Sequence, residues 1–210
     1  MRKVSTMATR RYDQRLRAET AEQTRQAILD AAYARLRAAP AEQLAIGAVA
    51  EEAGVARSTV YLIFGSRAGL FDALATDLLE RGRVDRLIEA VGNPDAREQL
   101  RGAIRASCDM FAVDRDVRRA LVSMSALDPA AVGGAIERGD ENRRRGTAQL
   151  AGRLHEQALL QPGVTRDDAA HLLWVLSSFD SFDSLYVGYG LDVDATCRVL
   201  TGTAERALLR

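Results

Sequence analysis

The chain has 210 residues, 47% of them hydrophobic and 28% charged, and its 29 basic and 29 acidic residues balance to a formal net charge of zero. This composition is typical of a globular protein, and without an apolar run long enough for a bilayer or a signal-peptide core we expect an intracellular, cytoplasmic protein with no membrane partner. Cys108, Cys197 and two histidines fit no metal-ligand spacing and are too few for a secreted disulfide framework, so we expect no metal and no cofactor.

The charge is distributed unevenly along the chain. Residues 1–17 hold six basic residues and one acidic residue. A basic segment next to a body of opposite charge is one property of nucleic-acid-binding proteins, although from charge alone a solvated terminus is the simpler interpretation. We predict a basic, flexible arm at residues 1–19.

Strand signals are nearly absent, and alanine and leucine recur at helical spacing, which predicts an all-α protein. Pro40 and Gly54 end the first two predicted helices, and Ser66 caps the fourth. These first four helices are expected at residues 20–38, 46–53, 56–63 and 66–91.

Capping residues predict five more helices, about nine in total. Asn93 before Pro94 begins the fifth, and a sixth follows at residues 117–127. Asp128-Pro129 begins the seventh, Thr165 with Asp168 resembles a capping box for an eighth that extends to about residue 187, and Asp192 caps the last. We therefore expect two units, a three-helix domain at residues 20–66 and a larger helical domain at residues 67–210.

The second and third helices have the pattern of a helix-turn-helix. Ala50 is small enough to let two helices approach, and Gly54 suits a left-handed turn. Val55 and Val60 can fill the core that the helices share. In this motif the second helix lies in the major groove of DNA, and its N-terminal turn meets the base edges.

Three polar residues occupy that N-terminal turn. Arg57 can bind guanine with two hydrogen bonds, while the hydroxyls of Ser58 and Thr59 can reach bases or phosphates. Tyr61 can donate its hydroxyl to a phosphate or pack in the small core. A solvated helix face is the alternative for the polar residues, and the helix-turn-helix context favours DNA contact.

At these residues the chain resembles a known family. The run IGAVAEEAGVARSTVYLIFGSRAGLFDAL, preceded by TRQAILDAAYARL, is similar to the N-terminal DNA-binding domain of the TetR family of bacterial transcriptional regulators. The resemblance rests on the Ala-Gly-Val turn, on the Thr-x-Tyr-x-x-Phe pattern that ends at Phe64, and on the Ser-Arg-x-x-Leu start of the next helix. It implies operator DNA as a partner, with Arg67 as a further contact.

The sequence departs from the family pattern at three positions. Ala45 and Ala56 stand where the family usually has a capping Thr or Ser, and Ile63 stands where a polar residue is common. Fewer contacts to the DNA backbone predict weaker binding per subunit, for which Arg10 and Arg11 in the basic arm can compensate.

The resemblance also implies a dimer formed through the last two helices. The segment at residues 167–189 is apolar on more than one face, so it needs a second packing partner. That partner is either the same subunit or a second copy, and a dimer is favoured because one helix-turn-helix reads too few bases to select a site. Candidate interface residues are Leu172, Phe182, Tyr186, Val199 and Leu208.

The resemblance further implies a ligand cavity in the larger domain, and with it a repressor released from its operator by a small hydrophobic molecule. Candidate walls are Met110, Phe111, Met124, Trp174 and Phe179, although ordinary core packing explains such side chains equally well. Asp180 and Asp183 could meet a cationic ligand or an arginine.

Two alternatives to a ligand-released repressor remain. The signal could be redox, sensed by Cys108 or Cys197. The chain could also be a helical enzyme, but it has no nucleophile elbow, phosphate loop or metal pair, so we expect no catalytic activity.

Overall fold

The computed structural model describes residues 4–40 and 42–210, without the side chains of residues 4–18 and of Gly133. The described chain is all-α, and its extended pairing is a single bridge between Leu160 and Leu209. The first helices are α1 (Val4–Ala38), α2 (Ile46–Glu52), α3 (Arg57–Phe64), α4 (Arg67–Arg81) and α5 (Val84–Val91). They are followed by α6 (Ala96–Ala112), α7 (Arg115–Leu127), the π-helical turn η1 (Pro129–Gly133), α8 (Gly134–Glu156), α9 (Arg166–Leu176), α10 (Phe179–Tyr186) and α11 (Val193–Leu208).

Side-chain caps fix several of these helix starts. The hydroxyl of Ser66 accepts a hydrogen bond from the Gly69 amide at 3.0 Å, and Thr165 with Asp168 forms the predicted capping box at the start of α9. Asp192 caps α11 as expected. The predicted start of the fifth helix is wrong by two residues, because Asp95 rather than Asn93 accepts from the first free amides of α6.

Two predicted helices are each broken into a pair. The helix expected at residues 66–91 is interrupted at Gly82 and Arg83, where Arg83 is left-handed with φ 59°. A Cβ at Gly82 would lie 2.5 Å from Cγ of Met110, so α6 approaches too closely for a larger residue. The helix expected to extend to residue 187 is broken before Ser178, whose hydroxyl caps α10.

Two hydrophobic cores divide the chain. The first joins α1 to α4 with α7 and η1, through large buried side chains that include Tyr33, Phe71 and Leu121. The second joins α6 and α8 to α11, through side chains that include Phe111, Leu154 and Phe182. Helix α7 therefore packs on α1 to α4, although the sequence places it beyond the predicted domain boundary at residue 66.

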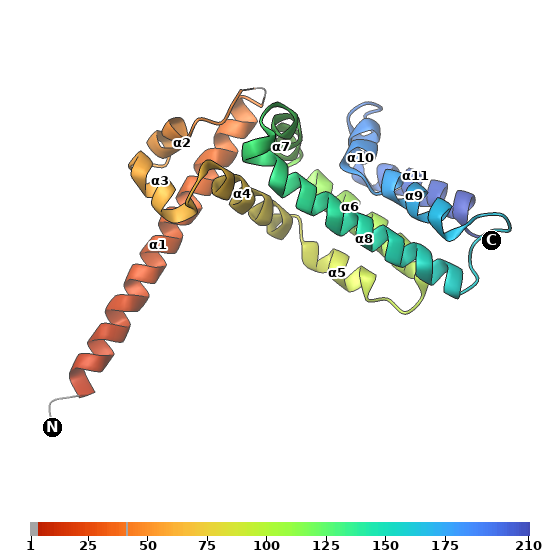
Figure 1. Ribbon diagram of the computed structural model, residues 1–210, viewed down its shortest axis with the longest axis horizontal. Helices are drawn as coiled ribbons and strands as arrows, with labels where there is room; N and C mark the ends of the chain where they lie inside the picture. Colours follow the sequence, from red (N-terminus) through yellow and green to blue (C-terminus); the bar gives the residue numbers. More distant parts are fainter. Residues whose placement is uncertain (1–3, 41) are drawn as a thin grey trace.

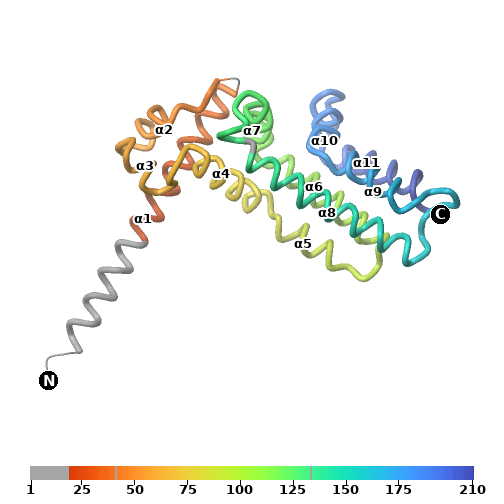
Figure 2. Tube along the Cα trace, in the orientation of Figure 1, coloured from red at the N-terminus to blue at the C-terminus, as the bar shows by residue number. Residues whose placement is uncertain are grey.

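The helices form a small head, which contains α1, α2 and α3, beside an elongated body, which contains α5, α6 and α8 to α11 (Figure 1). Figure 1 shows α2 and α3 against α1, with α4 leading from them toward the body. Figure 2 shows the trace continuing from α4 into α5 and then turning back along α6, which packs on α5. Helix α8 packs against α9, and α10 and α11 complete the far side of the second core. None of the helices in the described ranges is long and apolar enough to cross a membrane.

Candidate functional site

The turn between α2 and α3 has the predicted helix-turn-helix geometry. Gly54 is left-handed with φ 68°, and the amide of Val55 donates to the carbonyl of Ala50 at 2.9 Å. Ala50 and Val60 are buried in the first core. Ala45 and Ala56 occupy the N-cap positions without a side-chain hydrogen bond, so the two capping hydroxyls are missing as expected.

One face of α3 is presented to solvent. Arg57, Ser58 and Tyr61 are exposed, and Thr59 is half-buried at the edge of this face. Nη2 of Arg57 donates to the Tyr61 hydroxyl at 3.3 Å, and the guanidinium lies 5.6 Å from the centre of the Tyr61 ring. This contact fixes Arg57 along the helix, which lowers the entropy that it would lose on binding.

Leu62 belongs to the same face, and sequence reasoning missed it. Its side chain is 85% exposed, the largest exposure among the large hydrophobic side chains of the described chain. The sequence contains the spacing that predicts this position, because Leu62 follows Ser58 by one helical turn and so lies on the same face of α3. An apolar group on a groove-facing helix can contact the methyl group of thymine.

The inner face of α3 explains the departure at Ile63. Ile63 and Phe64 pack against the first core, and the guanidinium of Arg25 in α1 lies 5.8 Å from the centre of the Phe64 ring. A short helix is marginal on its own, so these contacts hold α3 in place. An apolar residue at position 63 adds to this packing.

Arg67, whose contact with DNA stays a prediction, forms contacts within the chain. Its guanidinium forms an ion pair with Asp128, which precedes η1, and lies 5.5 Å from the centre of the Phe71 ring. The structure thus uses Arg67 to join α4 to η1. Arg10 and Arg11 lie among the residues whose side chains are not described, so their contacts with DNA stay a prediction.

Two further ion pairs join α1 and α4 to the rest of the chain. Arg37 at the end of α1 pairs with Asp114 before α7, and Arg138 of α8 pairs with Asp72 of α4 at 2.5 Å. Pairs as exposed as these contribute little stability.

The five predicted pocket residues do not form one group. Phe111 and Phe179 meet edge to face, with ring centres 5.6 Å apart. Met110 lies in the second core, but Met124 lies in the first. Trp174 is half-buried, and the guanidinium of Arg143 lies 3.4 Å from the centre of its ring. The structure therefore brings together Phe111 and Phe179.

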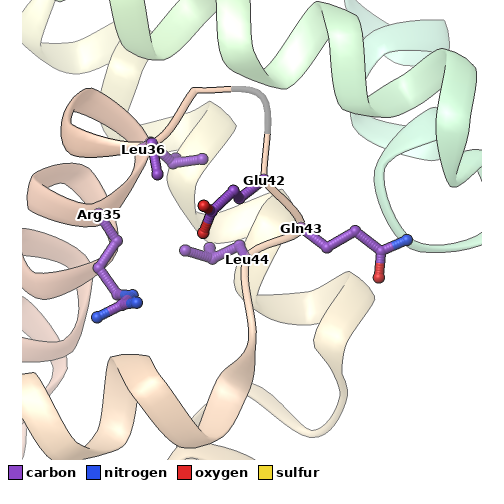
Figure 3. A pocket seen from close by; sticks show the side chains of 6 residues that line it. Arg35, Leu36, Glu42, Gln43 and Leu44 are labelled. Carbon is purple, nitrogen blue, oxygen red and sulfur yellow. The ribbon is translucent and has the colours of Figure 1, made fainter.

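A small hollow lies beside the end of α1. It measures about 10 Å³, which is room for about one water molecule and too little for an effector. Figure 3 shows that Gln43 points away from it. The labelled residues that line it are Arg35, Leu36, Glu42, Gln43 and Leu44.

A wider groove of about 380 Å³ lies open on the surface of α10 and α11. Leu176, Leu185, Val199 and Leu200 give it an apolar floor. The residues predicted at the dimer interface, and Val175 beside Leu176, differ in exposure. Leu172 and Tyr186 are half-buried, and Val175 and Val199 are 54% and 42% exposed. Phe182 and Leu208 were predicted at the interface, but both are buried in the core of their own subunit, which corrects that assignment.

The two aspartates of the eighth predicted helix are held by arginines. Asp183 is buried and accepts hydrogen bonds from Nε of Arg115 and Nη2 of Arg119, each at 2.5 Å, and Asp180 accepts from Arg119 at 3.1 Å. Burial would raise the pKa of Asp183, but the two guanidinium groups outweigh it and lower this pKa. Both aspartates are therefore ion-pair partners rather than free anions.

Cys108 of α6 and Cys197 of α11 are far apart in sequence but meet in the second core. Both are buried, and each thiol is close enough to shift the pKa of the other. The interaction with Cys197, together with burial, raises the pKa of Cys108. The interaction with Cys108 lowers the pKa of Cys197, against the effect of burial and with help from the Thr201 hydroxyl at 3.8 Å. In the described residues, no cluster of three His, Cys, Asp or Glu side chains could hold a metal ion.

Comparisons with known proteins agree with this geometry. Residues 28–74 match the model of the bacterial regulatory proteins of the tetR family. NalD, the secondary repressor of the MexAB-OprM multidrug efflux pump in Pseudomonas aeruginosa, is similar with a TM-score of 0.70 and 25% identity over 91% of this chain and 98% of that one. A TetR transcription regulator from Haloarcula marismortui has a TM-score of 0.68 and 21% identity, covering 89% and 99% of the two chains. A TetR-like regulator from Rhodococcus sp. RHA1 has a TM-score of 0.64 and 24% identity over 87% and 94%. No curated protein matches significantly in sequence.

Proposed function

This chain carries the DNA-binding domain of the tetR family of bacterial regulatory proteins on the fold of TetR-family regulators, and from that premise we propose that it is a homodimeric repressor released from operator DNA by a small hydrophobic effector. The observation that carries the proposal is the exposed face of α3, with Arg57, Tyr61 and Leu62. As a binder of chromosomal DNA it acts in the cytoplasm, without catalysis. The similarity to the repressor NalD supports repression over activation.

The chemistry of the α3 face matches a major groove. Arg57 can donate two hydrogen bonds to one guanine, and Leu62 can contact a thymine methyl group. Tyr61 lies one turn beyond Arg57, where its hydroxyl can reach a phosphate. Together they form a face that reads bases at its centre and the backbone at its edge.

The groove of α10 and α11 supports a dimer of two chains. Its apolar floor includes Val199, which is 42% exposed, and exposed apolar surface of this kind marks an interaction site. A two-fold contact there would cover the groove on both subunits. It would also present two α3 helices to successive major grooves, about 34 Å apart.

Release requires an effector that favours one orientation of the head. Phe111 and Phe179, which touch edge to face, are the proposed effector contacts. Phe111 is at the end of α6, close before α7, and α7 packs on the first core. An effector that displaces α7 from α6 would therefore turn both α3 helices out of register.

The test is binding to a DNA duplex from upstream of the chain's own gene, measured by fluorescence anisotropy at several salt concentrations. Arg57→Ala should weaken binding about 10- to 100-fold and reduce discrimination against unrelated duplex. Arg145→Ala is the matched control, since Arg145 is an exposed arginine of α8 in the body. It removes the same charge and should leave the affinity within about twofold.

Equal affinities of Arg57→Ala and the wild type would contradict the assignment of α3 as the reading helix. Equal loss in both variants would show that charge alone attracts the DNA. Wild-type protein that does not distinguish the promoter duplex from unrelated DNA at any salt concentration would contradict the proposed function itself.

The contact between Cys108 and Cys197 favours a second candidate, a redox-responsive regulator. A hydroperoxide would oxidise the two thiols to a disulfide, in which they lose two electrons and two protons while the O–O bond breaks to give water and an alcohol. Because the two cysteines join α6 to α11, the bond would cross-link the second core. Mass spectrometry after peroxide treatment should detect a loss of two hydrogens that Cys197→Ser abolishes, together with a change in operator affinity. Persistence of both free thiols, or unchanged operator affinity of the oxidised protein, would contradict this candidate.

A further inference from the structure

Arg118 of α7 differs from the two arginines beside it. Arg115 and Arg119 both form ion pairs with Asp183. Nε and Nη2 of Arg118 are instead buried and have no hydrogen-bond partner. A buried guanidinium without an anion is unusual, because removing a charge from water is costly unless it is paired. This side chain therefore lacks the partner that its surroundings demand.

The surroundings of Arg118 are aromatic. Its guanidinium lies 5.2 Å from the ring centre of Phe111 and 5.9 Å from that of Phe179, which are the two proposed effector contacts. Stacking on two rings accounts for part of its stability. Burial still lowers the pKa of Arg118 to about 10, so the side chain remains charged at neutral pH. Tyr33 and, after it, Asp114 favour this charge, but Asp114 is already paired with Arg37.

Arg118 also lies where the two cores meet. Its neighbours Val117 and Leu121 in α7 are buried in the first core, whereas Phe111 is buried in the second. The residue as a whole is half-buried, so part of its side chain is open to solvent, while Nε and Nη2 lie beneath this surface. An anion bound here would contact the helix that connects the head to the body.

We propose that the effector is an apolar molecule with one carboxylate, which pairs with Arg118 while its apolar part lies against Phe111 and Phe179. The proposal rests on the effector site proposed above and names the chemical class of its ligand. A guanidinium matches a carboxylate with two parallel hydrogen bonds, and Nε and Nη2 are two donors on one edge of that group. A doubly charged phosphate fits less well, because the nearby cations Arg115 and Arg119 are already paired.

Carboxylate binding gives the effector a preference between two states of the protein. The apolar rings alone would hold any hydrophobic molecule, but the unpaired charge rewards an anion. Because Arg118 moves with α7, closing the ion pair would draw α7 toward the ligand and away from its position between the cores. The effector would therefore bind more tightly to the state with α7 displaced. Release of the operator requires such a difference in effector affinity between the two states.

The test is isothermal titration calorimetry of the full chain with octanoate and 4-phenylbutanoate. Octan-1-ol and 4-phenylbutan-1-ol are neutral counterparts with the same apolar parts. The wild type should bind at least one acid about tenfold or more tightly than its alcohol. Arg118→Gln should weaken acid binding about 10- to 100-fold, as expected for loss of a charge-assisted pair.

Arg119→Gln is the matched control, because it removes a neighbouring charge over the same Phe179 ring while Arg115 still holds Asp183. Acid binding by this variant should stay within about threefold of the wild type. If Arg118→Gln fails to fold, Arg118→Lys keeps the charge without the two-pronged donor and should weaken acid binding while leaving alcohol binding unchanged.

Three results would overturn the proposal: no binding of either acid by the wild type, equal binding of acid and alcohol, or equal loss in the Arg118 and Arg119 variants. Operator affinity is measured on the same samples without ligand. If the operator is not bound but the acids bind through Arg118, the regulatory function fails and the carboxylate site stands. If the operator is bound and the acids are not, the regulatory function stands and the carboxylate site fails.

Discussion

The two hydrophobic cores differ in what they leave uncovered. Around the first core, the exposed face of α3 combines Arg57 and Tyr61 with one apolar residue, Leu62. The second core leaves several large apolar side chains in solvent, with exposures of 54% at Val175, 80% at Tyr189 and 42% at Val199. The first core is thus closed beneath a mostly polar face of α3, whereas the second borders an open apolar groove on α10 and α11.

This difference indicates that the surfaces over the two cores suit different kinds of partner. A polar face over a closed core can bind and release a charged polymer without a change in folding. An open apolar groove gains stability when a second apolar surface covers it. The following four substitutions test this contrast, beginning with the largest expected effect.

Phe71→Ala removes a side chain that is fully buried in the first core. We expect the free energy of unfolding to fall by about 3 to 5 kcal/mol, measured by urea denaturation. Leu79→Ala on the same helix is the control, because Leu79 is 38% exposed and should lose about 1 kcal/mol or less. Similar losses in the two variants would show that the first core is not closed as described.

Val199→Asp places a carboxylate in the groove of α10 and α11. If a second copy covers this groove, the dissociation constant of the dimer should rise about 100-fold, which is equivalent to about 3 kcal/mol. Sedimentation equilibrium measures this constant. Ile88→Asp on α5 is the control, since Ile88 is 68% exposed outside the groove. A dimer that persists unchanged in Val199→Asp would place the contact elsewhere.

Asp183→Asn removes the carboxylate shared by Arg115 and Arg119. At pH 7 we expect a loss of about 2 kcal/mol, a value reduced because both arginines are partly exposed. Folding lowers the pKa of Asp183, so its contribution is present above the unfolded value of about 4 and disappears as pH falls through the folded value.

The difference in stability between wild type and Asp183→Asn should therefore narrow below about pH 4, as followed by thermal unfolding across pH. Asp180→Asn should show almost no effect, because that side chain is 72% exposed. A difference that stays constant down to low pH would mean that the ion pairs with Asp183 do not act as described.

Leu62→Ala is expected to have the smallest effect. Stability should change by less than about 0.5 kcal/mol because the side chain is 85% exposed. Operator affinity should fall about three- to tenfold if Leu62 contacts a thymine methyl group. Fluorescence anisotropy with a duplex in which uracil replaces thymine tests the same contact from the DNA side, and unchanged affinity in both experiments would remove Leu62 from the reading face.

Local signals account for what the sequence predicted correctly. The turn at Gly54, the missing caps at Ala45 and Ala56, and the capping box of Thr165 each depend on a few neighbouring residues. The broken helix at residues 82–83 was missed because Arg83 takes a left-handed conformation that arginine rarely adopts. Gly82 precedes Arg83 in the sequence, but a single glycine inside a helical pattern does not by itself end a helix.

Contacts between distant segments could not be predicted from the same patterns. The pairing of Cys108 with Cys197, the ion pair of Arg67 and the unpaired Arg118 all depend on how α7 and α11 pack. Composition and periodicity give the faces of helices but not their partners. For that reason the predicted interface included Phe182 and Leu208, which are apolar at the right spacing but point inward.

The packing of α7 on the first core has a consequence for protein engineering. A fragment cut after Arg81 would contain α1 to α4 but would lose Val117, Ala120 and Leu121, leaving Tyr33 and Phe71 beside a bare surface. The reading head is therefore not a module that can be transplanted by a single cut in the gene. A chimera that changes operator preference would have to bring α7 with it, and with α7 the arginine that faces the other half of the molecule.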